Sequence, residues 1–223
     1  MKLHEFAQIN EASIFDEHAL INTKWTSIEQ LRKWLRKHGF KQLNSGVYAE
    51  VYAKPNHKRV VKISKHQDVC WIKFATWALK QSSNKYLPNI PWIHFYQDEN
   101  SGKKFFVTII ERLNRCSPQQ IKKIEDPVIA AAIWNHVDMY SRSSRHALDN
   151  RLEELFLQHY NTKITSTKQI TNLLRKNSAH RFVKTLIRVF GLGKDQCYDD
   201  LHDDNIMFRD NGTPVITDPI AEQ

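Results

Sequence analysis

Residues 198–208 read Tyr-Asp-Asp-Leu-His-Asp-Asp-Asn-Ile-Met-Phe, and this stretch decides the fold prediction. Four of the six residues from Asp199 to Asp204 are aspartates, although the whole chain carries a formal net charge of +9. Crowded carboxylates repel one another and raise each other's pKa unless a cation lies nearby. A divalent metal ion with oxygen ligands is the simplest compensation, and a solvent-exposed acidic loop is the alternative.

The spacing of the residues that follow favours the metal site. Asn205 lies five positions after Asp200, and Asp218 lies thirteen positions after Asn205, beyond the turn dipeptide Asn211-Gly212. This is the protein-kinase order, in which a catalytic Asp is followed by an Asn and then by a metal-binding Asp. In that chemistry Asp200 would orient an attacking hydroxyl and accept its proton. Asn205 and Asp218 would hold Mg²⁺ ions that bridge the phosphates of ATP.

Residues 43–51 occupy the place of a glycine-rich phosphate loop and read Leu-Asn-Ser-Gly-Val-Tyr-Ala-Glu-Val. A hairpin turn over phosphates needs small residues, because backbone amides must come close to the ligand. Only Gly46 is kept, whereas Asn44 and Ala49 stand where glycines are usual. The loop is therefore a weak signal when it is taken alone.

Two further segments follow in the kinase order. Residues 60–63, Val-Val-Lys-Ile, stand in place of the V-A-I-K strand, so Lys62 would pair with the α and β phosphates. Residues 109–113 end a predicted strand and fit a hinge whose backbone meets adenine. The predicted nucleotide-binding residues are Asn44, Gly46, Tyr48, Val51, Lys62, Glu111 and Leu113.

The order of elements predicts an α+β chain with two lobes. Residues 1–24 are expected to form an N-terminal extension, residues 25–113 a β-rich N-lobe, and residues 114–223 a truncated helical C-lobe. The predicted elements are a basic helix at 28–38, strands at 40–52 and 59–64, a helix at 68–81, strands at 92–97 and 104–112, helices at 121–140, 145–160 and 166–190, and a hairpin around 206–216.

Composition favours a soluble cytoplasmic protein with no membrane partner. Of the 223 residues, 41% are hydrophobic and 26% are charged, which excludes global disorder. The longest apolar runs, such as 128–134, are much shorter than the roughly 20 residues of a membrane span.

Three scattered cysteines, Cys70, Cys116 and Cys197, predict a reducing compartment and no disulfide framework. The positive charge allows nucleic-acid binding, but a solvated basic face on the helix at 28–38 is the favoured interpretation.

The chain resembles the early serine/threonine protein kinase of T-seven-like bacteriophages. The likeness lies in residues 39–46, 59–62 and 88–91, and above all in His202 with Asn205-Ile206-Met207-Phe208 and in Pro-Val-Ile-Thr-Asp-Pro at 214–219. The resemblance implies a two-lobed protein-kinase-like fold, ATP and Mg²⁺ as cofactors, and phosphorylation of host proteins, such as RNA polymerase or RNA-processing enzymes, in the host bacterial cytoplasm. By position, it implies that Lys62, Asp200 and His202 are catalytic and that Asn205 and Asp218 bind metal.

The sequence departs from the kinase pattern at two places. No acidic residue between Val69 and Gln97 could form the usual ion pair with Lys62, which leaves Asp68 as the nearest candidate. Pro219 and Ile220 follow Asp218 in place of Phe-Gly, and we expect no activation segment in its usual form.

Two alternative functions stay open. A small-molecule phosphotransferase of the aminoglycoside- or choline-kinase sort is favoured by His202, because a His at this position is common in those enzymes. A kinase-shaped, non-catalytic module that inhibits a host protein by binding is favoured by the depleted glycine-rich loop. The retention of Lys62, Asp200, Asn205 and Asp218 argues against the second alternative, because a scaffold has no need for Mg²⁺ ligands.

Overall fold

The computed structural model describes residues 17–46, 48–65, 68–192 and 196–222. The chain forms two compact units: one holds the described residues up to Asp68 together with Ile90–Arg112, and the other holds Val69–Asn89 together with the described residues from Leu113 onward. The predicted fold class, α+β with a β-rich first part and a helical second part, is confirmed. The expected boundaries at 25–113 and 114–223 stay a prediction. Val47 and residues 1–16 of the expected extension lie outside the described residues.

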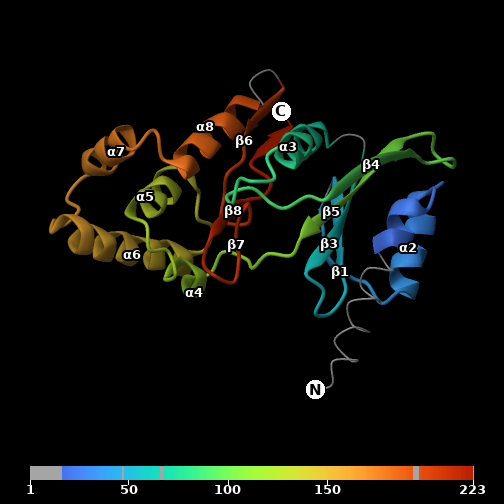
Figure 1. Ribbon diagram of the computed structural model, residues 1–223, viewed down its shortest axis with the longest axis horizontal. Coiled ribbons are helices and arrows are strands. Elements are labelled where there is room, and N and C mark those ends of the chain that lie inside the picture. The colour runs from blue at the N-terminus through green and yellow to red at the C-terminus, as the bar shows by residue number, and fades with distance from the viewer. Residues whose placement is uncertain (1–16, 47, 66–67, 193–195, 223) are drawn as a thin grey trace. The chain divides into compact units, whose positions relative to one another are not determined.

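The first unit contains a five-stranded antiparallel sheet with the strand order β1-β2-β3-β5-β4 (Figure 1). The prediction of one strand across 40–52 is wrong, because the chain reverses there and its two halves pair as a hairpin. The Gly46 N–H donates to the Ala49 carbonyl at 2.8 Å across this reversal. Residues 17–22 are helical, and the other elements are α2 (Ile28–Lys37), β1 (Lys41–Ser45), β2 (Ala49–Ala53), β3 (Arg59–Lys65), β4 (Trp92–Gln97) and β5 (Lys104–Glu111).

Helix α2 is the predicted basic helix, and it packs on one face of the sheet. Ser27 caps it, with the Ser27 Oγ accepting the Gln30 N–H at 3.1 Å, and Gly39 follows it with a φ of +80° that favours glycine. Leu31 and Leu35 have no exposed surface. They belong to one core cluster with Tyr52 of β2 and with alternate residues of β3 and β5, which are Val61, Ile63, Phe105, Val107 and Ile109.

The second unit contains helices and two short antiparallel strand pairs. The prediction of one helix across 166–190 is wrong, because Asn177 ends the first of two helices there. None of the described helices of the chain is long and apolar enough to cross a bilayer. The elements of this unit are α3 (Val69–Leu79), α4 (Pro118–Ile121), α5 (Pro127–His136), α6 (Arg142–Tyr160), α7 (Thr167–Lys176), α8 (Arg181–Leu192), β6 (Cys197–Asp199), β7 (Ile206–Phe208), β8 (Pro214–Ile216) and β9 (Ile220–Glu222).

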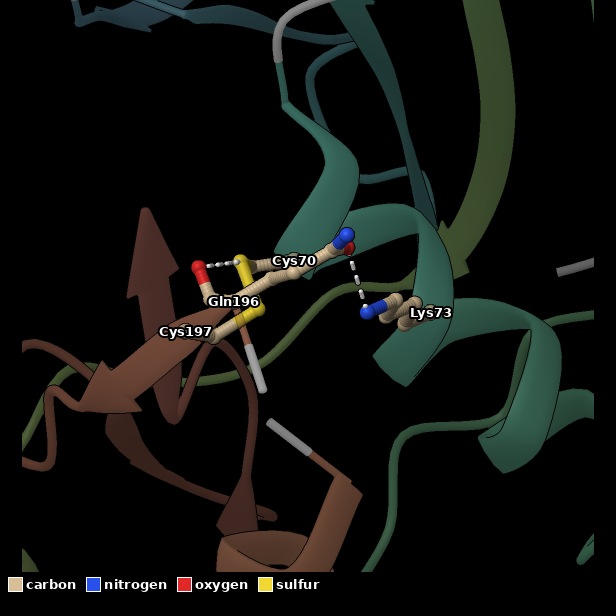
Figure 2. The surroundings of a disulfide bond; sticks show 4 residues. All are labelled: Cys70, Lys73, Gln196 and Cys197. Carbon is tan, nitrogen blue, oxygen red and sulfur yellow. Dashed lines mark hydrogen bonds between the residues drawn. A yellow bond between two sulfur atoms is a disulfide. The ribbon is translucent and has the colours of Figure 1, made fainter. Parts of the chain in front are cut away.

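A disulfide bond joins Cys70, the second residue of α3, to Cys197, the first residue of β6 (Figure 2). The prediction that the chain has no disulfide is therefore wrong. The two cysteines are 127 residues apart in the sequence, and only the folded chain brings their Cα atoms to 6.0 Å. Cys116 keeps a free thiol.

Asp98 joins the start of α2 to the turn between β4 and β5, and we predict that this contact makes stability depend on pH. Its carboxylate accepts the Ile28 N–H at 3.0 Å and the Ser101 N–H at 2.9 Å. The bond from Ile28 is the largest cause that holds the pKa of Asp98 below its usual value. The stabilisation is therefore present above the unfolded-state pKa and is lost as pH falls through the lower folded-state pKa.

Asp98→Asn should lower the free energy of unfolding at pH 7 by about 1.5–3 kcal/mol, because charged hydrogen bonds are lost. Urea unfolding at pH 7 and pH 3 should show a smaller difference between wild type and variant at the acidic pH. Glu99→Gln changes an exposed neighbouring carboxylate and is the matched control. An equal difference at both pH values would contradict the prediction.

Candidate active site

The structure brings the backbones of Asp200, Asn205 and Asp218 together where two strand pairs meet their connecting loops. β6 pairs with β9 and β7 pairs with β8, both antiparallel. The Asp200 N–H donates to the Pro219 carbonyl at 2.9 Å. The Thr217 N–H and Oγ1 both donate to the Asn205 carbonyl, at 2.9 and 3.1 Å. Asp218 therefore lies between Thr217, which is hydrogen-bonded to Asn205, and Pro219, which is hydrogen-bonded to Asp200.

The amide of Asn205 is oriented by its contacts. Its nitrogen lies 2.6 Å from the Asp200 carbonyl oxygen and 2.9 Å from His202 Nε2. A carbonyl oxygen can only accept, so the nitrogen must face Asp200, and the amide oxygen points away from it. The Asn205 residue is 8% exposed, and this oxygen is the atom that could bind a cation.

His202 lies against the other predicted residues. Its Nε2 is 3.8 Å from the Asp200 carboxylate, in addition to its contact with the Asn205 amide. His202 therefore lies next to Asp200 and Asn205. The role of each residue stays a prediction.

Residues 137–141, which follow α5, support the loop that carries Asp200, and the sequence analysis missed them. The Asp138 N–H donates to the Leu201 carbonyl and the Asp203 N–H donates to the Asp138 carbonyl, both at 3.0 Å. The ring of Tyr140 lies 4.8 Å from the His202 ring, and Tyr140 is 70% exposed. Partial desolvation, and then the charge of nearby carboxylates, raises the pKa of Tyr140. No sequence pattern links this segment to residues so far along the chain.

The β7–β8 hairpin is fixed from both sides. The backbones of Asn114 and Phe208 exchange two hydrogen bonds of 2.8 Å. On the other side, the Ile216 N–H donates to the Tyr86 carbonyl at 3.0 Å, and the Arg209 guanidinium donates to carbonyls of residues 85 and 87. This hairpin positions Asn205 and Asp218 together at its open end, opposite the turn at Gly212.

In the first unit, Lys62 lies at the centre of β3 and is 9% exposed. It pairs with Val51 on β2 and with Thr108 on β5, so two of the predicted nucleotide-binding residues are direct neighbours. Ser64 and Thr108 share its face of the sheet, because alternate strand residues point to the same side. Among the described residues, their buried hydroxyl oxygens have no hydrogen-bond partner. This face therefore presents a buried ammonium group and two hydroxyls.

The other predicted nucleotide-binding residues lie on the β1–β2 hairpin and at the end of β5. Asn44 is exposed on β1, and Tyr48 is 41% exposed near the start of β2. A Cβ at Gly46 would make only an ordinary contact, 3.8 Å from the Ala49 carbonyl oxygen. Glu111 ends β5 opposite Arg59, and Leu113 follows it as a half-buried residue of the second unit.

The candidate metal-binding residues of the second unit carry the type of donor atom that Mg²⁺ prefers, which is oxygen. Asn205 and Asp218 supply an amide oxygen and a carboxylate, the hard oxygen ligands that this ion prefers, and phosphates usually complete its coordination. Within the described residues there is no group of three or more His, Cys, Asp or Glu that could hold a metal ion.

No family model matches the chain, and no curated protein matches it. Among solved structures, the chain is similar to a thermostable mutant of an aminoglycoside phosphotransferase in ternary complex with AMP-PNP and hygromycin B. The identity is 11%, the TM-score is 0.37, and the match covers 88% of this chain and 73% of that chain. It is also similar to spectinomycin phosphotransferase in complex with ADP and spectinomycin, with 15% identity, a TM-score of 0.34, and coverage of 87% and 69%. Such low identity transfers no residue role to this chain.

The turn between β7 and β8 requires a glycine, and we predict that Gly212→Ala destabilises the candidate site. Gly212 has a φ of +80°, and a Cβ there would lie 2.6 Å from Lys123 Cβ and 3.1 Å from the Lys123 carbonyl oxygen. Gly102 has a φ of +67° with nothing within 4 Å of such a Cβ, so Gly102→Ala is the matched control.

Both variants should lose about 1–2 kcal/mol of stability from the left-handed backbone. Gly212→Ala should lose roughly 1–3 kcal/mol more, because Lys123 or the turn must move. Urea unfolding of the two variants measures the difference, and equal losses would contradict the steric explanation.

Proposed function

We propose that this chain is a phosphotransferase that moves the γ-phosphoryl group of ATP to a hydroxyl acceptor. The observation that supports the proposal is a pair of backbone hydrogen bonds, from Thr217 to Asn205 and from Asp200 to Pro219, which join the segments that carry the three predicted residues. Carboxylate and amide oxygens at this spacing are the groups that phosphoryl transfer uses to activate a hydroxyl and to hold magnesium.

Each residue has a separate task in this proposal. Asp200 orients the acceptor hydroxyl and takes its proton as the oxygen attacks phosphorus. Asn205 and Asp218 hold Mg²⁺, which offsets the negative charge of the phosphates when it is bound. Lys62 binds the α and β phosphates. The other proposed nucleotide-binding residues are Asn44, Gly46, Tyr48, Val51, Glu111 and Leu113. His202 positions the Asn205 amide, which it contacts at 2.9 Å.

Serine and threonine side chains of host proteins are the acceptors that we propose first. The resemblance of residues 39–46, 59–62, 88–91 and 202–219 to the phage serine/threonine kinase supports this choice. The same resemblance supports a role in the bacterial cytoplasm, with transcription or RNA-processing proteins as substrates.

A small-molecule hydroxyl is the second candidate acceptor. It is favoured by His202, which lies between the Asn205 amide and the exposed ring of Tyr140. A single exposed aromatic ring beside the proposed base could hold a small acceptor. The two candidates differ only in the acceptor, so one labelling experiment can compare them.

Nucleotide binding is the first expected outcome. Mg-ATP at 100 times its Kd should stabilise the wild type by about 2.7 kcal/mol, which thermal unfolding reports as a rise in Tm. Asp218→Ala should lose the magnesium-dependent part of this rise, because a metal ligand is removed. Asp204→Ala removes an exposed carboxylate of the same loop and should keep it. A magnesium-dependent rise that survives in Asp218→Ala would contradict the assignment.

Phosphoryl transfer is the second expected outcome. Incubation with γ-³²P-ATP and magnesium should label Ser or Thr in bacterial lysate proteins, and a panel of hydroxyl-bearing small molecules tests the second candidate in parallel. Asp200→Ala should lower the rate by on the order of 10²–10⁴-fold, because the proton acceptor is lost. Asp204→Ala is again the control.

The outcomes separate the three functions. Label in lysate proteins supports the protein kinase, whereas label only in small molecules contradicts it and supports the second candidate. If neither is labelled, and Asp200→Ala inhibits the host as strongly as the wild type, the chain is a binding module and the proposal fails.

A further inference from the structure

The Cys70–Cys197 disulfide lies on the strand that leads into the proposed catalytic residue. Cys197 begins β6, and Asp200 follows the end of β6 directly. β6 pairs with β9 through three residue pairs, from Cys197 with Glu222 to Asp199 with Ile220. The Asp200–Pro219 hydrogen bond then continues this pairing. The disulfide therefore fastens one end of a short strand pair whose other end holds Asp200 and the residue after Asp218.

The residues around the disulfide are drawn in Figure 2. The position of Cys70 favours reduction of the bond. Cys70 is in the first turn of α3, where backbone N–H groups and the helix dipole favour a negatively charged sulfur. Lys73, one turn further on, donates through Nζ to Gln196 Oε1 at 2.9 Å, and the Cys70 sulfur lies 3.9 Å from the Gln196 carbonyl oxygen. A Cys70 thiolate that is stabilised by the start of the helix makes the disulfide easier to reduce.

We propose that Cys70 and Cys197 form a reversible redox site, reduced by a dithiol of the thioredoxin class and reoxidised by a disulfide of the same class. The oxidised bond holds β6 against the first turn of α3. Reduction releases this tether and loosens the β6–β9 pair. The effect on catalysis rests on the proposed function, because the released strand leads into Asp200. In the cytoplasm, disulfides are usually of this transient kind.

The exchange is balanced in atoms and electrons. A thiolate of the reductant attacks one sulfur, the S–S bond breaks, and a mixed disulfide forms. The second thiol of the reductant then attacks the mixed disulfide and leaves as part of a cyclic disulfide. Two electrons and two protons pass to Cys70 and Cys197, which become thiols. Attack at Cys197 is favoured, because it is 6% exposed against 1% for Cys70, and because the Cys70 thiolate is the better leaving group.

Cys116 provides an internal contrast. Burial, and then the charges of Asp203 and Asp204, raise the pKa of the Cys116 thiol to about 12. This thiol stays protonated at neutral pH and is a poor nucleophile in thiol–disulfide exchange. The redox response is therefore expected from Cys70 and Cys197 alone.

The first test counts free thiols in the full chain and uses no variant. The protein is equilibrated in buffers with different ratios of reduced to oxidised dithiothreitol and then denatured and labelled with a maleimide. Intact mass should show a cooperative transition from one label to three as the ratio rises. One label at every ratio means a permanent structural disulfide, and three labels at every ratio means no disulfide. Either result overturns the proposal.

The second test measures the consequence of reduction. The wild type should lose about 5–15 °C in Tm when it is reduced, because a crosslink over a long loop is removed. Cys70→Ala and Cys197→Ser should resemble the reduced wild type and should not respond to dithiothreitol, whereas Cys116→Ser should respond like the wild type. If the wild-type Tm is the same before and after reduction, the disulfide does not stabilise the fold, and this result also contradicts the proposal.

Phosphoryl transfer is measured on the same samples. The oxidised wild type should be faster than the reduced protein by on the order of tenfold, because a positioned catalytic group is loosened. If both forms transfer phosphate at the same rate, the proposed link to Asp200 is wrong. If neither form transfers phosphate, the proposed function fails, while the thiol count and the Tm still decide whether the redox site exists.

Discussion

The candidate site depends on two backbone carbonyls, those of Asn205 and Pro219, which accept hydrogen bonds from Thr217 and Asp200. Because of these bonds, the position of Asp218 depends on the register of the β7–β8 and β6–β9 pairs. A shift of one residue in the β7–β8 or β6–β9 pairing would turn alternate side chains to the opposite face. The register is fixed outside the site, at the Gly212 turn and at the two hydrogen bonds between Asn114 and Phe208. The strand pairing therefore brings the segments that carry Asp200, Asn205 and Asp218 together.

A similar constraint acts on Lys62 in the first unit. Val61 and Ile63 of β3 belong to the core cluster that packs against α2. Because successive strand residues point to opposite faces, Lys62 lies on the other face of the sheet. A buried ammonium group is costly unless polar groups surround it. Ser64 and Thr108 lie on the same face of the sheet as Lys62. The hydrophobic core of the sheet thus determines where the phosphate-binding residue of the proposal can lie.

The sequence predicted the parts of the fold that local chemistry specifies. The turn at Asn211-Gly212 within the 206–216 hairpin is a short-range signal, and it is confirmed. Helical periodicity continued through Asn177, so it could not show where α7 ends. The β6–β9 pairing, the support from Asp138 and the Cys70–Cys197 bond join segments that are distant in sequence. Each of these contacts exists only because the rest of the chain has folded, and one sequence carries no signal for them.

Helix α3 is joined by a covalent bond to the strand that leads to Asp200. In protein kinases, a Glu on the helix after the Lys strand must pair with that Lys, and the position of the helix controls activity. Here the helix carries no acidic residue, and its first turn is instead bonded to Cys197, three residues before Asp200. Within the second unit, the helix is therefore linked to the proposed base through β6. A covalent bond gives this link a dependence on redox conditions that an ion pair would not have, so the same helix position can serve a different kind of control.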